Sequence, residues 1–244
     1  MPVLSVQPIQ TEIFQPRQDL LQFVKSSVPR TLVQERMILV ITSKIVSLAE
    51  NRLVAKDSIS KKELVQQEAD VFLGEVAYGC YLTVKHGLFI PSAGIDESNS
   101  ATGDYILFPK DPYQSAENLW SALKKEWNLK ELGILITDSH TTPLRKGVTG
   151  IGLAYWGFQG LRNLVGTEDL FGRQLVMTNM NLVDGLSVAA VMMMGEGNEC
   201  QPLAVIHGAS VVFSEKTNRD EIAMPLQEDL YAPFFKQATT KSSS

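Results

Sequence analysis

The stretch "ILITDSHTTPLRKG", Ile134 to Gly147, joins an apolar run to a dense group of polar side chains. The apolar run begins at Leu132 and ends at Thr137, and it predicts a buried strand. An acid, a hydroxyl, an imidazole and two cations follow, namely Asp138, Ser139, His140, Arg145 and Lys146. A loop that only connects two elements does not need so many groups able to bind a ligand. The stretch therefore indicates a buried strand that delivers a binding or catalytic site.

The composition is that of an ordinary globular protein. Of the 244 residues, 44% are hydrophobic and 20% are charged, which excludes a disordered or fibrous chain. A chain of this length can bury a sizeable core, and no clear linker divides it, so we expect one domain over residues 1–236. The end of the chain, residues 237–244, has the polar sequence QATTKSSS and predicts a disordered tail.

Charge and hydropathy exclude several kinds of partner. The net charge is −5 and there is no basic block, which argues against nucleic acid. The apolar run Val188–Met194 is too short to span a bilayer, and the N-terminus shows no secretory signal, so no membrane partner is expected. Cys80 and Cys200 lack the spacing of metal ligands and predict reduced thiols in a cytoplasmic protein.

Helix and strand patterns alternate along the chain. Helices are predicted at residues 19–28, 43–52, 111–127 and 184–195, and a capping box opens the segment 60–75. Strands are predicted at residues 37–42, 81–85, 105–108, 132–137, 174–183 and 202–208, and the glycine-rich segment 147–158 is expected to be extended. The mixture predicts an α+β fold with mixed or antiparallel sheets and flanking helices.

Three loops that carry acids follow apolar or strand-like segments. Asp96 follows FIPSAGI, Asp138 follows LGILIT, and Glu196 follows VAAVMMM. Carboxylate and hydroxyl oxygens suit Mg²⁺ or Mn²⁺, with water and phosphate completing the coordination shell. Glycines beside the acids let backbone N–H groups approach phosphate oxygens, and Arg145 is a cation able to neutralise phosphate or carboxylate.

Each of these features also has a purely structural explanation. The segment Asp96–Asn99 has a composition typical of turns, Asp138 can cap the next segment, and Glu196 can be a solvated loop acid. His140 has no second His or Cys at ligand spacing, which argues against zinc. The phosphate-binding loop of nucleoside triphosphatases and the nucleophile elbow are both absent, and Gly150-Ile-Gly152 is an incomplete dinucleotide fingerprint.

Long ordered motifs resemble those of the coenzyme F-420 γ-glutamyl ligase family. "HGLFIPSAGIDESNSATGDYILFPKDPYQSA" is similar to the family pattern hGlv-NAGvDeSN-…-LLPrDPd-SA, and "GILITDSHTTPLRKGVTGIGLA" to viisDTfGRPwR-GqtdvAIG. "DLFGRQLVMTNMNLVDGLSVAAVMMMGEG" resembles D-fGR-L-vT-va-aDelAaAA-LvmGq, and "LVITSKIVSLAENR" resembles vv-sTivSKAEgr. The resemblance covers most of the chain, from about Met37 to Gly208.

The resemblance implies a ligase that uses GTP, or ATP, to activate a carboxylate and join it to the amine of L-glutamate. It implies Mg²⁺ or Mn²⁺ between protein acids and nucleotide phosphates, two interleaved subdomains and an intertwined homodimer. Carried over by motif, the expected metal ligands are Asp96, Asp138, Ser139 and Glu196. The expected nucleotide-binding residues are Thr11, Glu12, Ile13, Phe14, Ser43, Lys44, Asn99, Met194, Gly195, Gly197 and Asn198, with Thr11–Phe14 in an N-terminal strand. Asp138, His140 and Arg145 are the expected catalytic residues, His140 as a general base or as a replacement for the family's aromatic residue.

The chain also departs from the family motifs. The Gly-Arg pair of DTfGRPwR is absent, although Pro143 and Arg145 keep their places. Other family residues are replaced here by Leu48 (for Lys), Ser92 (for Asn), Gly185 (for Glu) and His207 (for Arg). These changes leave the acceptor open between a deazaflavin F-420 precursor and a folate. Two other functions stay open: a non-catalytic nucleotide- and metal-binding protein, and a nucleotide phosphohydrolase.

Overall fold

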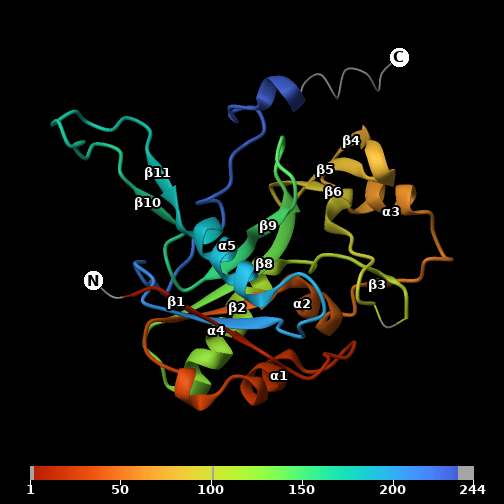
Figure 1. Cartoon of the computed structure of the whole chain (residues 1–244), viewed down its shortest axis with the longest axis horizontal. Coiled ribbons are helices and arrows are strands. Elements are labelled where there is room, and N and C mark those ends of the chain that lie inside the picture. The colour runs from red at the N-terminus through yellow and green to blue at the C-terminus, as the bar shows by residue number, and fades with distance from the viewer. Residues whose placement is uncertain (1–2, 101, 236–244) are drawn as a thin grey trace.

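A mixed five-stranded sheet forms the centre of the molecule (Figure 1), in a computed structural model that describes residues 3–100 and 102–235. Its strands, in spatial order, are β1 (Ser5–Ile9), β12 (Leu203–His207), β2 (Met37–Thr42), β8 (Leu132–Thr141) and β9 (Val148–Trp156). The strands β2 and β8 run parallel, and the other neighbours in the sheet run antiparallel. The tail predicted at 237–244 lies outside the described residues.

Helices cover both faces of this sheet, because alternate residues of its strands point to opposite sides. One face packs against α1 (Leu20–Ser27), α2 (Ser43–Ala49) and α4 (Pro112–Trp127). The other face packs against α5 (Leu182–Met194). Both faces of the central strands are therefore buried, which explains why β2 reads as a continuous apolar run.

A smaller apolar cluster lies beside the central sheet and includes Leu64, Tyr81, Ile95 and Leu107. The elements around this part are β3 (Leu53–Val54), α3 (Lys61–Glu68), β4 (Val71–Glu75), β5 (Tyr81–Lys85), β6 (Leu88–Pro91) and β7 (Tyr105–Ile106). The strands β10 (Leu161–Asn163) and β11 (Asn179–Asn181) form a hairpin that projects from the body (Figure 1). No helix in the described part of the chain combines the length and apolar character needed to cross a membrane.

The predicted α+β class, with mixed sheets and flanking helices, is confirmed. The capping signals also form as expected: Asp111 caps α4 by accepting a hydrogen bond from the Gln114 backbone N–H, and Ser60 and Glu63 form the capping box of α3. The interleaved subdomains, the single domain over 1–236 and the homodimer stay predictions.

Several boundaries differ from the sequence prediction; the helix predicted at 43–52 ends at Ala49, and the strand predicted at 105–108 ends at Ile106. The segment 60–75 is helical only as far as Glu68 and then becomes strand β4, whose β-favouring residues pair with β5. The predicted strand 174–183 is wrong for most of its length, since only Asn179–Asn181 is a strand and α5 begins at Leu182. The strand predicted to end at Thr137 continues to Thr141, because β9 pairs with it that far.

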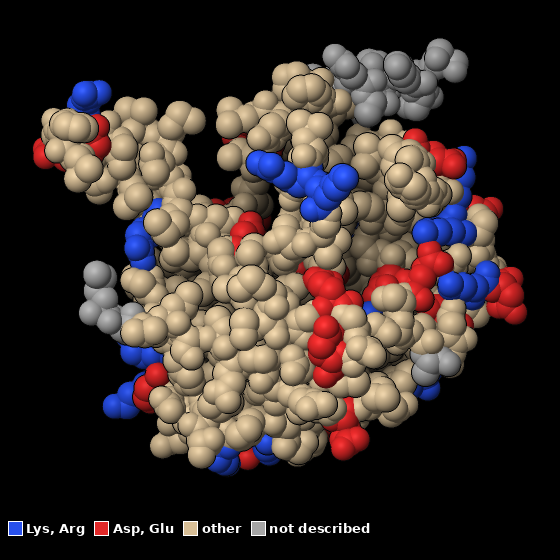
Figure 2. All heavy atoms as spheres, in the orientation of Figure 1, with Lys and Arg blue, Asp and Glu red and all other residues tan. Residues whose placement is uncertain are grey.

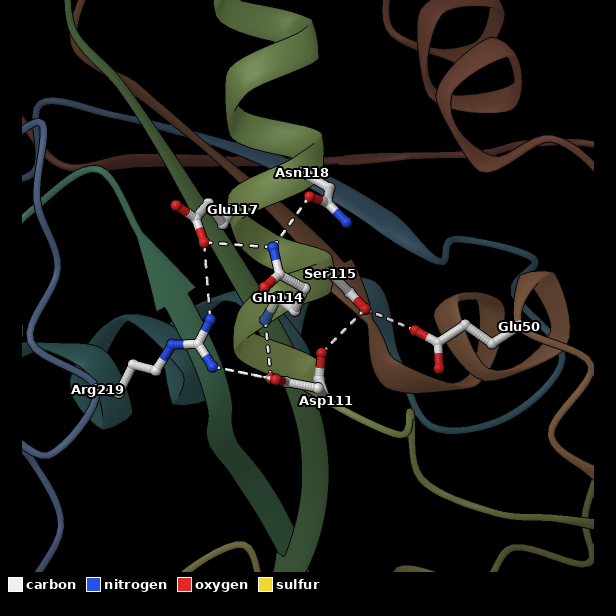
Figure 3. Close-up of polar contacts among 7 residues, drawn as sticks. All are labelled: Glu50, Asp111, Gln114, Ser115, Glu117, Asn118 and Arg219. Carbon is white, nitrogen blue, oxygen red and sulfur yellow. Dashed lines mark hydrogen bonds and ion pairs between the residues drawn. The ribbon is translucent and has the colours of Figure 1, made fainter.

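Helix α2 is tied to α4 by Glu50, the residue that follows its last turn (Figure 3). The Glu50 carboxylate accepts hydrogen bonds from the Ser115 hydroxyl at 2.6 Å and from the Lys110 backbone N–H at 2.8 Å. On the other side of the start of α4, Arg219 forms ion pairs with Asp111 at 3.1 Å and Glu117 at 3.6 Å. These contacts join α2, α4 and the C-terminal segment.

Glycines in β9 allow α5 to lie directly on the sheet. A Cβ atom at Gly150 would lie 2.4 Å from the Ser187 carbonyl oxygen, and one at Gly152 would lie 2.2 Å from a methyl group of Val183. The glycine-rich segment thus forms the close backbone approach that its composition predicts. This packing also fixes the end of α5, from which the loop carrying Glu196 emerges.

We expect Gly150→Ala to lower the free energy of unfolding by about 1–3 kcal/mol, because helix α5 must move away from β9. Gly185→Ala is the matched control, since a Cβ there meets nothing within 4 Å. In the interior of α5 it should instead stabilise the protein, by about 0.5–1 kcal/mol. Urea denaturation of the two variants checks this, and equal stabilities would contradict the close packing.

Candidate functional site

A cleft of about 800 Å³ opens where β2 and β8 run toward α2 and the loop after α5. It brings together all of the residues expected from sequence to bind metal or nucleotide, and also His140. These are Thr11, Glu12, Ile13, Phe14, Ser43, Lys44, Asp96, Asn99, Asp138, Ser139, His140, Met194, Gly195, Glu196, Gly197 and Asn198. The elements that supply them lie far apart in sequence, so the fold collects them.

The parallel pairing of β2 and β8 places the first two site residues together. Thr42 lies opposite Thr137 in the sheet, so the residues that follow them, Ser43 and Asp138, are neighbours. The Ser43 hydroxyl donates a hydrogen bond of 3.0 Å to Oδ2 of Asp138. The second carboxylate oxygen, Oδ1, accepts one of 2.7 Å from the Ser139 backbone N–H. Asp138 is therefore oriented by fixed partners.

The charge of Asp138 is not compensated by these contacts. Burial raises the pKa of its carboxyl to about 6, and the nearby charge of Asp96 adds to this, against the hydrogen bonds from Ser139 and Ser43 and the charge of Lys44. A carboxylate in this state is stabilised by any cation that reaches it.

The loop after α5 supplies a second acid, Glu196, which is only partly shielded from solvent. Burial raises the pKa of Glu196, although the Ser139 side chain hydrogen-bonds its carboxylate and partly opposes the shift. In the same loop, the Gly197 backbone N–H donates to Glu199 at 2.8 Å. The Asn99 amide donates to the Gly197 carbonyl oxygen at 3.4 Å, which joins this loop to the one that carries Asp96.

Asp96 differs from the other two acids because a cation already contacts it. Its Oδ2 forms an ion pair of 2.6 Å with the Lys44 ammonium, and its Oδ1 accepts hydrogen bonds from the backbone N–H and hydroxyl of Ser98 at 2.7 and 2.8 Å. Burial opposes the charge of Asp96, but Lys44 and Ser98 together hold its pKa below the ordinary value.

Two of the predicted catalytic residues, His140 and Arg145, line different cavities. His140 lines the cleft from strand β8, and its Nδ1 lies 3.2 Å from the Thr149 carbonyl oxygen. Arg145 lies beyond the end of β8 and lines a smaller cavity of about 460 Å³, with Phe89 and Thr141. Strands β8 and β9 form an antiparallel hairpin, and Figure 2 shows basic side chains near its turn and acidic side chains below it, over the loop that follows α5. The structure thus separates Arg145 from the acids of the main cleft.

Thr11–Phe14 also differ from expectation, since they line the cleft in an irregular segment and not in a strand. The N-terminal strand is β1, which ends at Ile9 and was not predicted. Ser98 is a site residue that the sequence did not single out. It lies within the turn Asp96–Asn99, but nothing in the sequence indicates its contact with Lys44.

The donors in the cleft suit a hard cation that shares its shell with a ligand. Among the described residues, no three His, Cys, Asp or Glu side chains are grouped closely enough to hold a metal ion alone. Asp138, Ser139 and Glu196 together offer two carboxylates and a hydroxyl, linked through Ser139. Mg²⁺ is commonly bound in this way, by one or two carboxylates, water and substrate phosphates.

In the absence of divalent ions, we expect Asp138→Asn and Asp96→Asn to have opposite effects on stability. The folded-state pKa of Asp138 is raised, so its ionised form lowers the free energy of unfolding. This loss is at most about 3 kcal/mol, is complete above about pH 6 and is absent below pH 3.8. The folded-state pKa of Asp96 is lowered, so its ionised form stabilises the fold above the ordinary pKa.

At pH 8 with a chelator present, Asp138→Asn should therefore raise Tm and Asp96→Asn should lower it. At pH 4 the gain from Asp138→Asn should shrink. Thermal unfolding followed by circular dichroism measures both effects. A lower Tm for both variants at pH 8 would contradict the difference between the two acids.

Comparison with known proteins agrees with the motifs. A family model described as F420-0:Gamma-glutamyl ligase matches residues 8–208. A coenzyme F420:L-glutamate ligase of Methanococcus maripaludis is 34% identical over 216 residues, which cover 82% of this chain and 86% of the relative. The protein of the same name from Methanocaldococcus jannaschii is 40% identical over 147 residues, or 60% of this chain and 58% of the relative. The Methanopyrus kandleri protein is 29% identical over 226 residues, covering 85% and 88%. This chain therefore belongs to the F420-0:gamma-glutamyl ligase family.

Proposed function

We propose that this protein is a nucleotide- and metal-dependent γ-glutamyl ligase. In this proposal it uses GTP or ATP to activate a carboxylate on a small acceptor, and it joins that carboxylate to the amine of L-glutamate. The observation that carries the proposal is the meeting of Asp138, Ser139 and Glu196 with Ser43 and Lys44 in one cleft. Membership of the family and the names of the relatives support the reaction type.

In this proposal, one set of cleft residues binds the metal ion and another binds the phosphates of the nucleotide. Asp138, Ser139 and Glu196 would hold Mg²⁺ or Mn²⁺, which when bound neutralises phosphate charge. Gly195 and Gly197 lie in the same wall, and glycine lets the backbone come close to phosphate oxygens. Strand β8 holds Asp138 and Ser139 on a rigid element, and phosphoryl transfer depends mainly on such positioning.

The proposed reaction has two displacement steps. An acceptor carboxylate oxygen attacks the γ-phosphorus, and the bond to the nucleoside diphosphate breaks. The glutamate amine then attacks the activated carbonyl carbon, and phosphate leaves with the bonding electrons. The amine must lose a proton, and we assign its acceptance to His140, the one histidine of the chain that lines the cleft.

The acceptor is either the F420 precursor suggested by the relatives' name or a folate. Leu48 lines the cleft where the family motif has a lysine, so this chain lacks one cation able to hold an anionic acceptor there. Arg145, in the neighbouring smaller cavity, is a cation that could take over that part.

Glutamate addition is tested directly. The protein is incubated with Mn²⁺, L-glutamate and either GTP or ATP, against a panel of deazaflavins and folates. We expect mass spectrometry to show one acceptor that gains a glutamyl residue, and no reaction without metal. Phosphate release that does not require glutamate would indicate a phosphohydrolase, and nucleotide binding without turnover would indicate a binding protein.

Asp138→Asn should lower the rate of this reaction about 100-fold or more, the order seen when a group that stabilises transition-state charge is lost. Asp57→Asn serves as control, because Asp57 is exposed and does not line the cleft. Equal rates in the two variants would remove Asp138 from the mechanism.

We also propose that the protein is a homodimer. Large apolar side chains are exposed on the segment between β10 and β11, where Leu170 is 98% and Phe171 81% exposed, and on α5, where Met192 is 74% exposed. Exposed apolar surface of this kind is typical of contact surfaces between proteins.

Light scattering at micromolar concentration should give a dimer mass. Replacing Leu170 and Phe171 together by serine should shift the protein toward the monomer while circular dichroism shows each chain still folded, because both side chains already face solvent within one chain. A monomeric mass for the wild-type protein would contradict the proposal.

A further inference from the structure

Lys44 is a cation held inside the acidic cleft. It lies in the first turn of α2, and its ammonium contacts Oδ2 of Asp96 at 2.6 Å, the Ser98 carbonyl oxygen at 3.2 Å and the Ser98 hydroxyl oxygen at 3.3 Å. Three oxygens therefore surround one ammonium group, which has three hydrogens to donate. The Lys44 side chain is 25% exposed, so it is largely enclosed.

These contacts give both carboxylate oxygens of Asp96 a partner. Its Oδ2 takes the ammonium of Lys44, and its Oδ1 takes the two hydrogen bonds from Ser98. A metal ion bound to Oδ2 would lie about 2.1 Å from that oxygen, in the region that the ammonium already occupies. Lys44 would also repel such an ion, since both carry positive charge.

Asp138 and Glu196 are in the opposite situation. Asp138 is held by the Ser43 hydroxyl and a backbone N–H, which are neutral donors, and Glu196 is held by Ser139. No ion pair of 4.0 Å or less reaches either carboxylate from the described lysines and arginines. Within the cleft, Asp96 therefore has a lysine as its counter-ion, whereas Asp138 and Glu196 have no such partner.

We propose that Lys44 is the permanent counter-ion of Asp96, so that this cleft takes a single divalent ion, at Asp138, Ser139 and Glu196. Asp96 then positions Lys44 and does not ligate the metal. The ammonium supplies a second, fixed positive charge beside the phosphates. This inference rests on the proposed metal-dependent function. In it, the cleft holds two positive charges, the divalent ion and the ammonium of Lys44.

The number of Mn²⁺ ions bound per chain tests the proposal without any turnover. Metal-free protein is titrated with Mn²⁺, and free Mn²⁺ is followed by its electron paramagnetic resonance signal. We expect one ion per chain in the wild type and two in Lys44→Met, in which Asp96 loses its counter-ion. The double variant Lys44→Met/Asp96→Asn should return to one, because the added ion depends on the carboxylate of Asp96.

Lys56→Met is the matched control. Lys56 pairs with Glu97, the residue next to Asp96, but Glu97 keeps a second partner in Lys61 at 2.6 Å, so one ion per chain is expected. Lys44→Gln is a second variant, expected to behave as Lys44→Met, and melting curves show that each variant is folded.

Two wild-type ions, or the same number in the wild type and in both Lys44 variants, would overturn the inference and leave the ligase proposal standing. Wild-type protein that takes up no Mn²⁺ would contradict the metal dependence and this inference together. A second ion in Lys44→Met from a protein that adds glutamate to no acceptor would support the inference while the ligase proposal fails.

Discussion

Two buried strands that run in the same direction, β2 and β8, set the geometry on which the cleft depends. Their register pairs Thr42 with Thr137, and so it places Ser43 beside Asp138 at the same edge of the sheet. Both faces of the sheet pack against helices, so a shift of one residue would exchange the side chains of the two buried faces and disrupt the close packing on both. The core therefore fixes the register, and the register fixes the position of the first acid. The loops that carry Asp96 and Glu196 line the same cleft at this edge.

The charge balance of the cleft works against the stability of the metal-free protein. Burial raises the pKa of both Asp138 and Glu196, whereas Lys44 and Ser98 lower the pKa of Asp96. An enzyme that binds phosphates through a cation needs carboxylates that are not already neutralised by the protein. The proposed function thus explains why Asp138 and Glu196 have no counter-ion. The ion pair of Lys44 with Asp96 reduces the electrostatic repulsion among the three carboxylates.

Much of this site could be predicted from the sequence, because its residues lie in short ordered motifs at the ends of apolar segments. The helix that begins after Asp111 was predictable for the same reason, since its cap and its proline are local signals. Contacts between distant segments were not predictable. The extension of β8 past Thr137 depends on its pairing with β9, and the ion pair of Lys44 with Asp96 depends on how helix α2 packs against the loop that carries Asp96. Arg145 was expected near phosphate, but the hairpin carries it to a separate cavity.

The anchoring of α2 at its far end has a consequence for how the cleft can adapt to ligands. Ser43 follows directly from strand β2, and Glu50 is bound to the start of α4, so both ends of this short helix are fixed to the core. The loop that carries Asp96 is tied to this helix by the contacts of Lys44 with Asp96 and Ser98. The loop that carries Glu196 is held less firmly, since the side-chain hydrogen bond described between these two loops is the 3.4 Å contact of Asn99 with Gly197. Ligands of different size would be accommodated by movement of the Glu196 loop, while α2 and the Asp96 loop keep their places.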